Sequence, residues 1–98
     1  ADGVRTSAVG RIPWAQLSRL IDDVVTVTED EIKLAMLEAA RRAHIVAEPS
    51  GAVSIAGWLR YGVRLPDADE SDVVMVVSGG NVDPESYRSC LAEAAALE

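Results

Sequence analysis

The chain has 98 residues, of which 49% are hydrophobic and 26% are charged, a composition that suits one small folded domain and excludes an intrinsically disordered chain. Its net charge of −7, with one lysine and scattered arginines, argues against a protein that binds nucleic-acid phosphates. No apolar run is long enough to cross a membrane, and the single cysteine excludes an internal disulfide and favours a reducing, cytoplasmic compartment.

The first half of the chain predicts two helices separated by a short strand. After a small, polar loop over Ala1–Ile12, we expect a short helix over Pro13–Ile21. The β-branched run Val24–Val27 is typical of a strand. Thr28–Glu31 has the pattern of a capping box and predicts a helix over Glu29–Ile45. We expect the buried stripe of that helix to consist of residues at helical spacing: Ile32, Met36, Ala39, Ala40 and Ala43.

The second half predicts a helix, a strand and a last helix. The helix over Pro49–Tyr61 is followed by a polar loop over Arg64–Asp72. The apolar run Val73–Val77 ends at turn residues, which is typical of a strand buried on both faces. Asp83 is a good N-cap for a helix over Pro84–Leu97. Small residues let the first of these helices approach another element closely: Gly51, Ala52, Ala56 and Gly57.

The predicted order of elements is helix, strand, helix, helix, strand, helix. Strands separated by helices imply parallel pairing, and the strands of such a sheet are covered on both faces. We therefore expect an α/β fold in which residues 1–98 form a single domain or a fragment of a three-layer domain with a parallel sheet. Two strands are few for such a sheet, and the chain opens at Ala1–Gly3 without a methionine. Both features favour a piece of a longer chain.

The turn after the predicted strand Val73–Val77 is the strongest candidate for a ligand site. Gly79 and Gly80 allow another group to approach the main chain closely. Ligands of open α/β sheets lie at the carboxyl ends of the strands. The pattern is neither a dinucleotide fingerprint nor a phosphate-binding loop, because G-x-G-x-x-G and G-K-[ST] are absent. A tight connection without a ligand explains the same residues, so both interpretations stay open.

Few other residues have the spacing of a chemical site. Five acidic residues form a cluster that could suggest a metal: Asp22, Asp23, Glu29, Asp30 and Glu31. Capping explains three of them, and their spacing matches no EF-hand, so we do not expect a metal site here. His44 and Cys90 have no partner at ligand spacing, so neither predicts a metal centre or a nucleophile. Glu48 precedes a helix start and is placed to face the Ser78–Asn81 turn. A helix cap is the alternative interpretation of Glu48.

Four blocks of sequence occur in an order that resembles a known enzyme family. They are Ala1–Val4, Asp22–Ile32, Glu48–Ala52 and Ser78–Asp83. Together they resemble the C-terminal part of the large cofactor-binding domain in fold-type II pyridoxal-phosphate enzymes, with serine/threonine dehydratases and serine racemase as the nearest group. The resemblance implies the cofactor pyridoxal 5′-phosphate and L-serine or L-threonine as substrate. It also implies a homodimer once the remainder of the enzyme chain is present.

The resemblance assigns roles to individual residues. It implies that the Ser78 hydroxyl hydrogen-bonds the pyridine nitrogen of the cofactor and that the pair Gly79 and Gly80 shapes the pocket wall. A neutral hydroxyl cannot hold a charged ring nitrogen as a carboxylate would, which suits β-elimination of water from a hydroxy-amino acid. Glu48 is implied to lie beside the cofactor ring. Asn81 resembles a nucleotide contact of serine racemase, and Ser7 would lie near the substrate.

Two departures from the family pattern bear on what this chain does by itself. The lysine that carries the cofactor in this family lies in an N-terminal Ser-x-Lys context, which Lys33 does not match, and the glycine-rich loop for the cofactor phosphate is absent. We therefore expect this chain alone to be inactive. Gly10–Trp14 replaces the Pro-Gly-Glu stretch of common threonine dehydratases and is closer to serine racemase. The first interpretation is that this chain is part of a dehydratase. The alternatives are part of a serine racemase, or a stand-alone, non-catalytic module that binds a partner or a small ligand.

Overall fold

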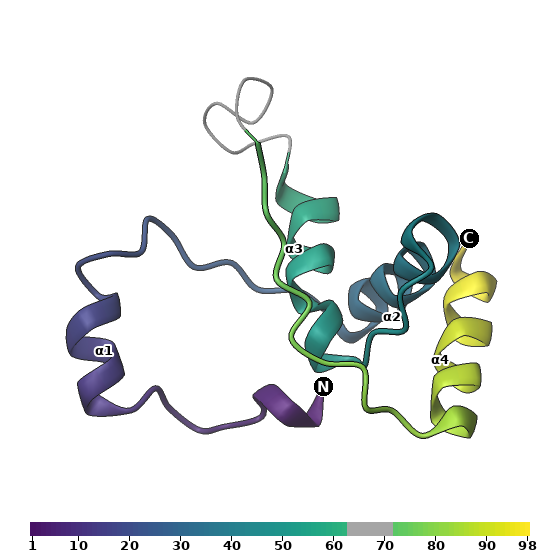
Figure 1. Ribbon diagram of the computed structural model, residues 1–98, viewed down its shortest axis with the longest axis horizontal. Coiled ribbons are helices and arrows are strands. Elements are labelled where there is room, and N and C mark those ends of the chain that lie inside the picture. The colour runs from purple at the N-terminus through teal and green to yellow at the C-terminus, as the bar shows by residue number, and fades with distance from the viewer. Residues whose placement is uncertain (63–71) are drawn as a thin grey trace.

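The computed structural model describes residues 1–62 and 72–98, and the regular elements in those ranges are all helical (Figure 1). In chain order they are a 3-10 turn (Asp2–Val4), α1 (Arg11–Leu17), α2 (Glu29–Glu38), a π-helical turn (Ala39–Ala43), a 3-10 turn (Ser50–Ala52), α3 (Val53–Tyr61) and α4 (Pro84–Leu97). The predicted polar loop over Arg64–Asp72 lies outside the described residues except for Asp72. No helix in the described ranges is long and apolar enough to cross a membrane.

Helix α2 begins at the predicted capping box. The backbone amide of Glu31 donates to Thr28 Oγ1 (3.2 Å), and the amide of Thr28 donates to Glu31 Oε2 (2.8 Å). These reciprocal bonds satisfy two amides that a helix start otherwise leaves unpaired. The bond from the Thr28 amide, helped by the guanidinium of Arg60, lowers the pKa of Glu31. The helix continues through the π-helical turn and ends at His44, close to the predicted end.

His44 adopts a left-handed backbone conformation, so His44→Gly is expected to stabilise the protein by about 0.5–1 kcal/mol. Its φ of 55° is the one positive value at a non-glycine residue in the described ranges. Glycine adopts this conformation without the steric strain of a Cβ atom. Urea unfolding measures the change in stability. Ala43→Gly, inside the π-helical turn, is the control and should destabilise instead. Equal effects of the two variants would contradict strain at His44.

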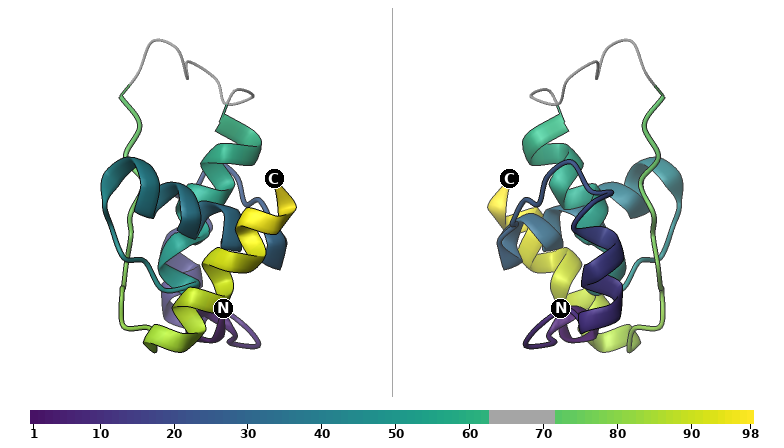
Figure 2. Two further views of the ribbon diagram at one scale, coloured as in Figure 1. Left: turned by 90° about the vertical axis from the view of Figure 1, so that its right-hand side faces the viewer. Right: turned by 90° about the vertical axis from the view of Figure 1, so that its left-hand side faces the viewer.

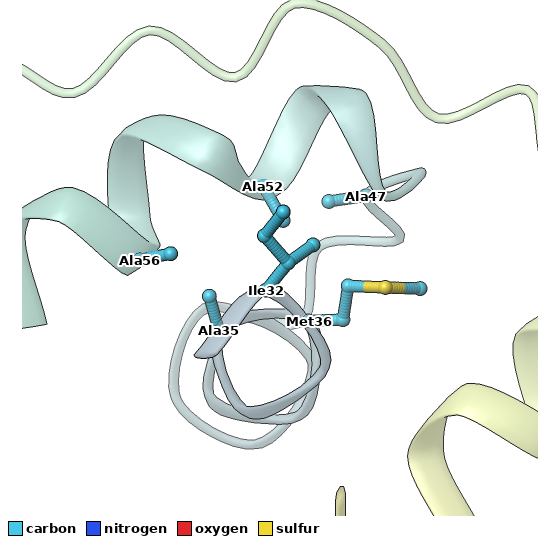
Figure 3. Packing of buried hydrophobic residues seen from close by; sticks show 6 residues of the cluster. All are labelled: Ile32, Ala35, Met36, Ala47, Ala52 and Ala56. Carbon is cyan, nitrogen blue, oxygen red and sulfur yellow. The ribbon is translucent and has the colours of Figure 1, made fainter. Parts of the chain in front are cut away.

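The hydrophobic core is small and lies where α2 meets the chain around α3. Figure 3 shows its six buried residues, which are Ile32, Ala35, Met36, Ala47, Ala52 and Ala56. Met36 is the largest fully buried side chain in the described part of the protein. Because the other members include four alanines, the backbones approach closely, as the small residues of the third predicted helix indicated.

The predicted stripe of α2 is only partly confirmed. Ile32, Met36 and Ala39 are buried, whereas Ala40 is half-buried and Ala43 is exposed. A π-helical turn holds more residues per turn than an α-helix. The turn therefore rotates Ala43 away from the direction that a spacing of 3.6 residues predicts.

Helix α4 packs along α2 (Figures 1 and 2). One surface ion pair joins the two helices, and a second joins the π-helical turn to the residue after α4. Lys33 Nζ lies 2.5 Å from Glu93 Oε2. The guanidinium of Arg41 donates to both carboxylate oxygens of Glu98, at 2.8 and 3.0 Å. Exposed pairs of this kind contribute little to stability because water and salt screen the charges. The buried Ala94 lets the two helices come close together.

Helix α1 stands apart from α2, α3 and α4 (Figure 1). It forms close to the predicted position, although it spans Arg11–Leu17 rather than Pro13–Ile21. None of its residues is buried, and Ile12 is 74% exposed. The separated helix is consistent with a radius of gyration of 14.5 Å, compared with about 13 Å for a compact domain of this length.

The predicted parallel sheet, and with it the α/β fold class, is wrong for the structure: its described residues contain no strand. Val24–Val27 and Val73–Val77 are extended, but no backbone hydrogen bond joins them. Val74 is 85% exposed, whereas a strand of a parallel sheet is covered on both faces. A strand forms only where a second backbone pairs with its amides and carbonyls. Here a side-chain hydrogen bond from α3 holds each segment instead, from Tyr61 to Thr26 and from Ser54 to Val76.

Candidate functional site

The turn Ser78–Gly80 lies against the segment that enters the third predicted helix. The backbone amide of Glu48 donates a hydrogen bond to the carbonyl oxygen of Gly79 at 3.0 Å. The structure therefore brings together Glu48 and the two glycines of the turn, which the sequence had singled out separately.

Glycines make this close contact possible. A Cβ atom on Gly51 would overlap the carbonyl oxygen of Gly79, and one on Gly80 would overlap the carbonyl oxygen of Val46. At Gly79 the nearest atom is Oε1 of Glu48, the end of a flexible side chain. No glycine in the described ranges has a positive φ. Gly51 and Gly80 are therefore required for close approach of two backbones, not for a left-handed turn.

Side chains alternate along the extended segment that leads into the turn. Val74 and Val76 are 85% and 70% exposed, whereas Met75 between them is 38% exposed. Ser78 continues the outward-facing series and is itself exposed. In extended chain, successive side chains point to opposite sides. The Ser78 hydroxyl is therefore on the outer side of the segment, away from packed hydrocarbon.

A polar cavity of about 350 Å³ opens beside this turn. Three sequence blocks meet there, and the polar or glycine residues that they contribute to its wall include Asp2, Gly3, Glu48, Ser50, Asn81 and Asp83. A Cβ atom on Gly3 would lie 2.7 Å from Ser50 Oγ, which shows how closely the start of the chain approaches. The volume is in the range of small-molecule sites, about 300–1,000 Å³.

Asp83 is a carboxylate of this cavity that is already engaged. It accepts hydrogen bonds from the Ser86 amide (2.9 Å) and the Ser86 hydroxyl (2.8 Å). These bonds lower the pKa of Asp83 because they favour its charged form. Asp83 thus stays ionised as the N-cap of α4, as predicted. The amide of Asn81 and the hydroxyl of Ser50 are neutral polar groups in the same wall.

Of the candidate residues, Glu48 and Asn81 line this cavity, whereas the turn Ser78–Gly80 lies beside it and is not part of its wall. Ser7 is exposed, in the chain between the first 3-10 turn and α1, and does not line it. Conversely, the sequence did not single out Ser50, Asp83 and Ser86 as parts of a site. Their positions beside Glu48 and Asn81 in the sequence were the available signal.

Lys33, the only lysine, is engaged on another surface. Its hydrogen bond with Glu93 raises the pKa of the Lys33 ammonium. A protonated amine is a poor nucleophile. Within residues 1–62 and 72–98, no three His, Cys, Asp or Glu side chains gather as they would around a metal ion.

Comparisons with known proteins point to one enzyme family. The family model described as "Pyridoxal-phosphate dependent enzyme" matches residues 1–79. The chain is 41% identical to serine racemase of Bos taurus over 83 residues, 85% of this chain and 25% of that protein. It is 39% identical to serine racemase of Homo sapiens over 83 residues, 85% of this chain and 24% of that protein.

The similarity extends to L-threonine dehydratases of Staphylococcus aureus. The chain is 36% identical to "L-threonine dehydratase catabolic TdcB" of Staphylococcus aureus (strain COL) over 83 residues, 85% of this chain and 24% of that protein. The chain thus spans about a quarter of the length of the curated relatives that it matches. No solved structure matches it.

Proposed function

Because this chain belongs to the family of pyridoxal-phosphate dependent enzymes, we propose that it forms the C-terminal part of the large cofactor-binding domain in an enzyme acting on L-serine or L-threonine. The reaction is dehydration, which gives a 2-oxo acid and ammonia. The observation that carries this proposal is the outward-facing Ser78 hydroxyl. It lies on a turn that the backbone amide of Glu48 holds by a 3.0 Å hydrogen bond to the carbonyl oxygen of Gly79.

The groups on and beside the turn fit the pyridine side of this cofactor. When bound, pyridoxal phosphate supplies an electron sink for bonds to the Cα atom of the substrate. The Ser78 hydroxyl would form a hydrogen bond with the ring nitrogen. A hydroxyl carries no charge, so it does not favour a proton on that nitrogen as a carboxylate would. Such a site suits the loss of water from a hydroxy-amino acid.

The neighbouring residues have supporting roles in this proposal. Gly79 and Gly80 would form the wall beside the ring, and a side chain at Gly80 would displace the turn because it would meet the Val46 backbone. The Glu48 carboxylate would lie beside the ring, and the Asn81 amide offers a neutral hydrogen-bonding group in the adjoining cavity that Glu48 also lines. Ser7 belongs to the substrate side, on a segment exposed in this structure.

Racemisation of serine is the second candidate, and the serine racemases among the relatives favour it. An assay of the complete protein with pyridoxal phosphate separates the two activities. We expect release of 2-oxo acid from serine or threonine. Formation of D-serine without 2-oxo acid would show racemisation in place of dehydration. If neither product forms, the proposal is overturned. The proposal includes a homodimer and a cytoplasmic location, the latter supported by the single cysteine.

The 98-residue chain by itself is expected to form no covalent lysine adduct with pyridoxal phosphate. Its one lysine, Lys33, forms an ion pair with Glu93, which raises the pKa of the Lys33 ammonium. Mixing the purified chain with the cofactor should give only the absorbance spectrum of free pyridoxal phosphate. Lys33→Ala is the control and should give the same spectrum. A stable adduct band that disappears in Lys33→Ala would contradict this expectation.

A further inference from the structure

Helix α3 holds both extended segments by side-chain hydroxyl groups. Ser54 Oγ donates to the carbonyl oxygen of Val76 at 2.7 Å, and the Tyr61 hydroxyl donates to the carbonyl oxygen of Thr26 at 2.9 Å. A spacing of seven residues places Ser54 and Tyr61 on the same side of the helix. Within residues 1–62 and 72–98 no strand pairing holds these two segments, so these side-chain bonds help to fix which residues face α3.

The bond from Ser54 reaches a point two residues before Ser78. Along this segment Met75 faces inward, whereas Val74 and Val76 face outward. In an extended chain, a slip of one residue exchanges the inward and outward sides. A slipped segment would turn Ser78 toward α3 and would move Gly79 away from the amide of Glu48.

We propose that Ser54 is a positioning residue: its hydroxyl fixes the register of Val73–Val77 and so keeps the Ser78 hydroxyl on the outer side of the turn. This inference rests on the proposed function, which gives Ser78 its role toward the cofactor. Ser54 itself contacts the main chain of Val76 and does not touch the cofactor.

Three variants of Ser54 separate the hydroxyl group from side-chain volume. Ser54→Thr keeps the hydroxyl. Ser54→Val has nearly the same shape as Ser54→Thr but has no hydroxyl, and Ser54→Ala removes the hydroxyl without adding volume. Ser54 borders a cavity of about 310 Å³, so there is room for the added methyl groups. Tyr61→Phe is the matched control, because it removes the equivalent bond to the other extended segment.

The first measurement is hydrogen exchange of the Glu48 amide, which reports the contact with Gly79 without any cofactor. In the complete protein, Ser54→Val and Ser54→Ala should raise its exchange rate about fivefold, the equivalent of one net hydrogen bond. Ser54→Thr should keep the original rate, and Tyr61→Phe should leave it unchanged. The proposal is overturned if Ser54→Val and Ser54→Thr exchange alike, or if Tyr61→Phe accelerates exchange equally.

The second measurement is the absorbance spectrum of the bound cofactor in the complete protein, which distinguishes this inference from the proposed function. Ser54→Val should change the spectrum in the same direction as Ser78→Ala, and Ser54→Thr should restore it. If Ser78→Ala changes the spectrum and Ser54→Val does not, Ser54 is not a positioning residue. If Ser78→Ala itself leaves the spectrum unchanged, the role proposed for Ser78 fails, whatever the exchange data show.

Discussion

Gly51→Ala is expected to destabilise the protein by about 3 kcal/mol and to separate the two halves of the candidate site. An added Cβ atom would overlap the carbonyl oxygen of Gly79 and crowd its amide nitrogen, at 3.0 Å. The added Cβ atom is fixed to the backbone of residue 51 and meets the backbone of Gly79, so no side-chain rotation relieves the overlap. The two backbone segments must therefore move apart where the Glu48 amide donates to the Gly79 carbonyl oxygen. Urea unfolding measures the loss of stability, and the exchange rate of the Glu48 amide measures the separation.

Gly57→Ala is the matched control for this prediction. A Cβ atom on Gly57 would meet only Val25 Cγ2, at the ordinary contact distance of 3.9 Å. Gly57 lies inside α3, where alanine is favoured over glycine by about 1 kcal/mol. The control should therefore be more stable than the original protein. A Gly51→Ala variant as stable as Gly57→Ala would show that the backbones do not meet at this point.

Ser78→Ala is expected to lower kcat/KM of the complete enzyme by about 10- to 100-fold. In the role proposed for Ser78, removing the hydroxyl would leave the ring nitrogen of the bound cofactor without a hydrogen-bond partner, and an unsatisfied buried group costs about 1–3 kcal/mol. Stability should change little, because the Ser78 side chain is exposed in the chain itself. Steady-state kinetics with serine and threonine, and a melting curve, measure the two effects.

Two further variants sharpen this prediction. Ser78→Asp places a carboxylate at the ring nitrogen, which favours a proton there. It should therefore change the ratio of 2-oxo acid to D-amino acid formed, not only the rate. Ser89→Ala, at an exposed position in α4, is the control and should keep both the rate and the ratio. Equal activity of Ser78→Ala and Ser89→Ala would contradict a cofactor contact at Ser78.

Local signals in the sequence predicted the helices because their causes are local. Thr28 and Glu31 satisfy each other's amides within one turn, and Asp83 caps α4 through Ser86. Neither arrangement needs another part of the chain. The strands are different, since the β-branched run Val24–Val27 becomes a strand only where a second backbone pairs with it. Its composition predicted the extended shape but could not supply that partner.

The candidate site shows the same division between local and distant causes. Glu48 and the glycine turn were recognisable from residue type and spacing, and the structure brings them into contact. The roles of Ser54 and Gly51 depend on which backbone atoms of Val76 and Gly79 lie opposite them. Those neighbours are distant in sequence. The sequence therefore predicted that the helix would approach another element closely, but not which element.

The most direct test of this account is the nitrogen-15 chemical shift of the cofactor ring. Pyridoxal phosphate labelled at the pyridine nitrogen would be bound to the complete protein and to its Ser78→Ala variant. We predict a shift typical of an unprotonated, hydrogen-bonded nitrogen in the original protein, and a clear change in the variant. A protonated ring nitrogen in the original protein, or the same shift in both proteins, would contradict the account.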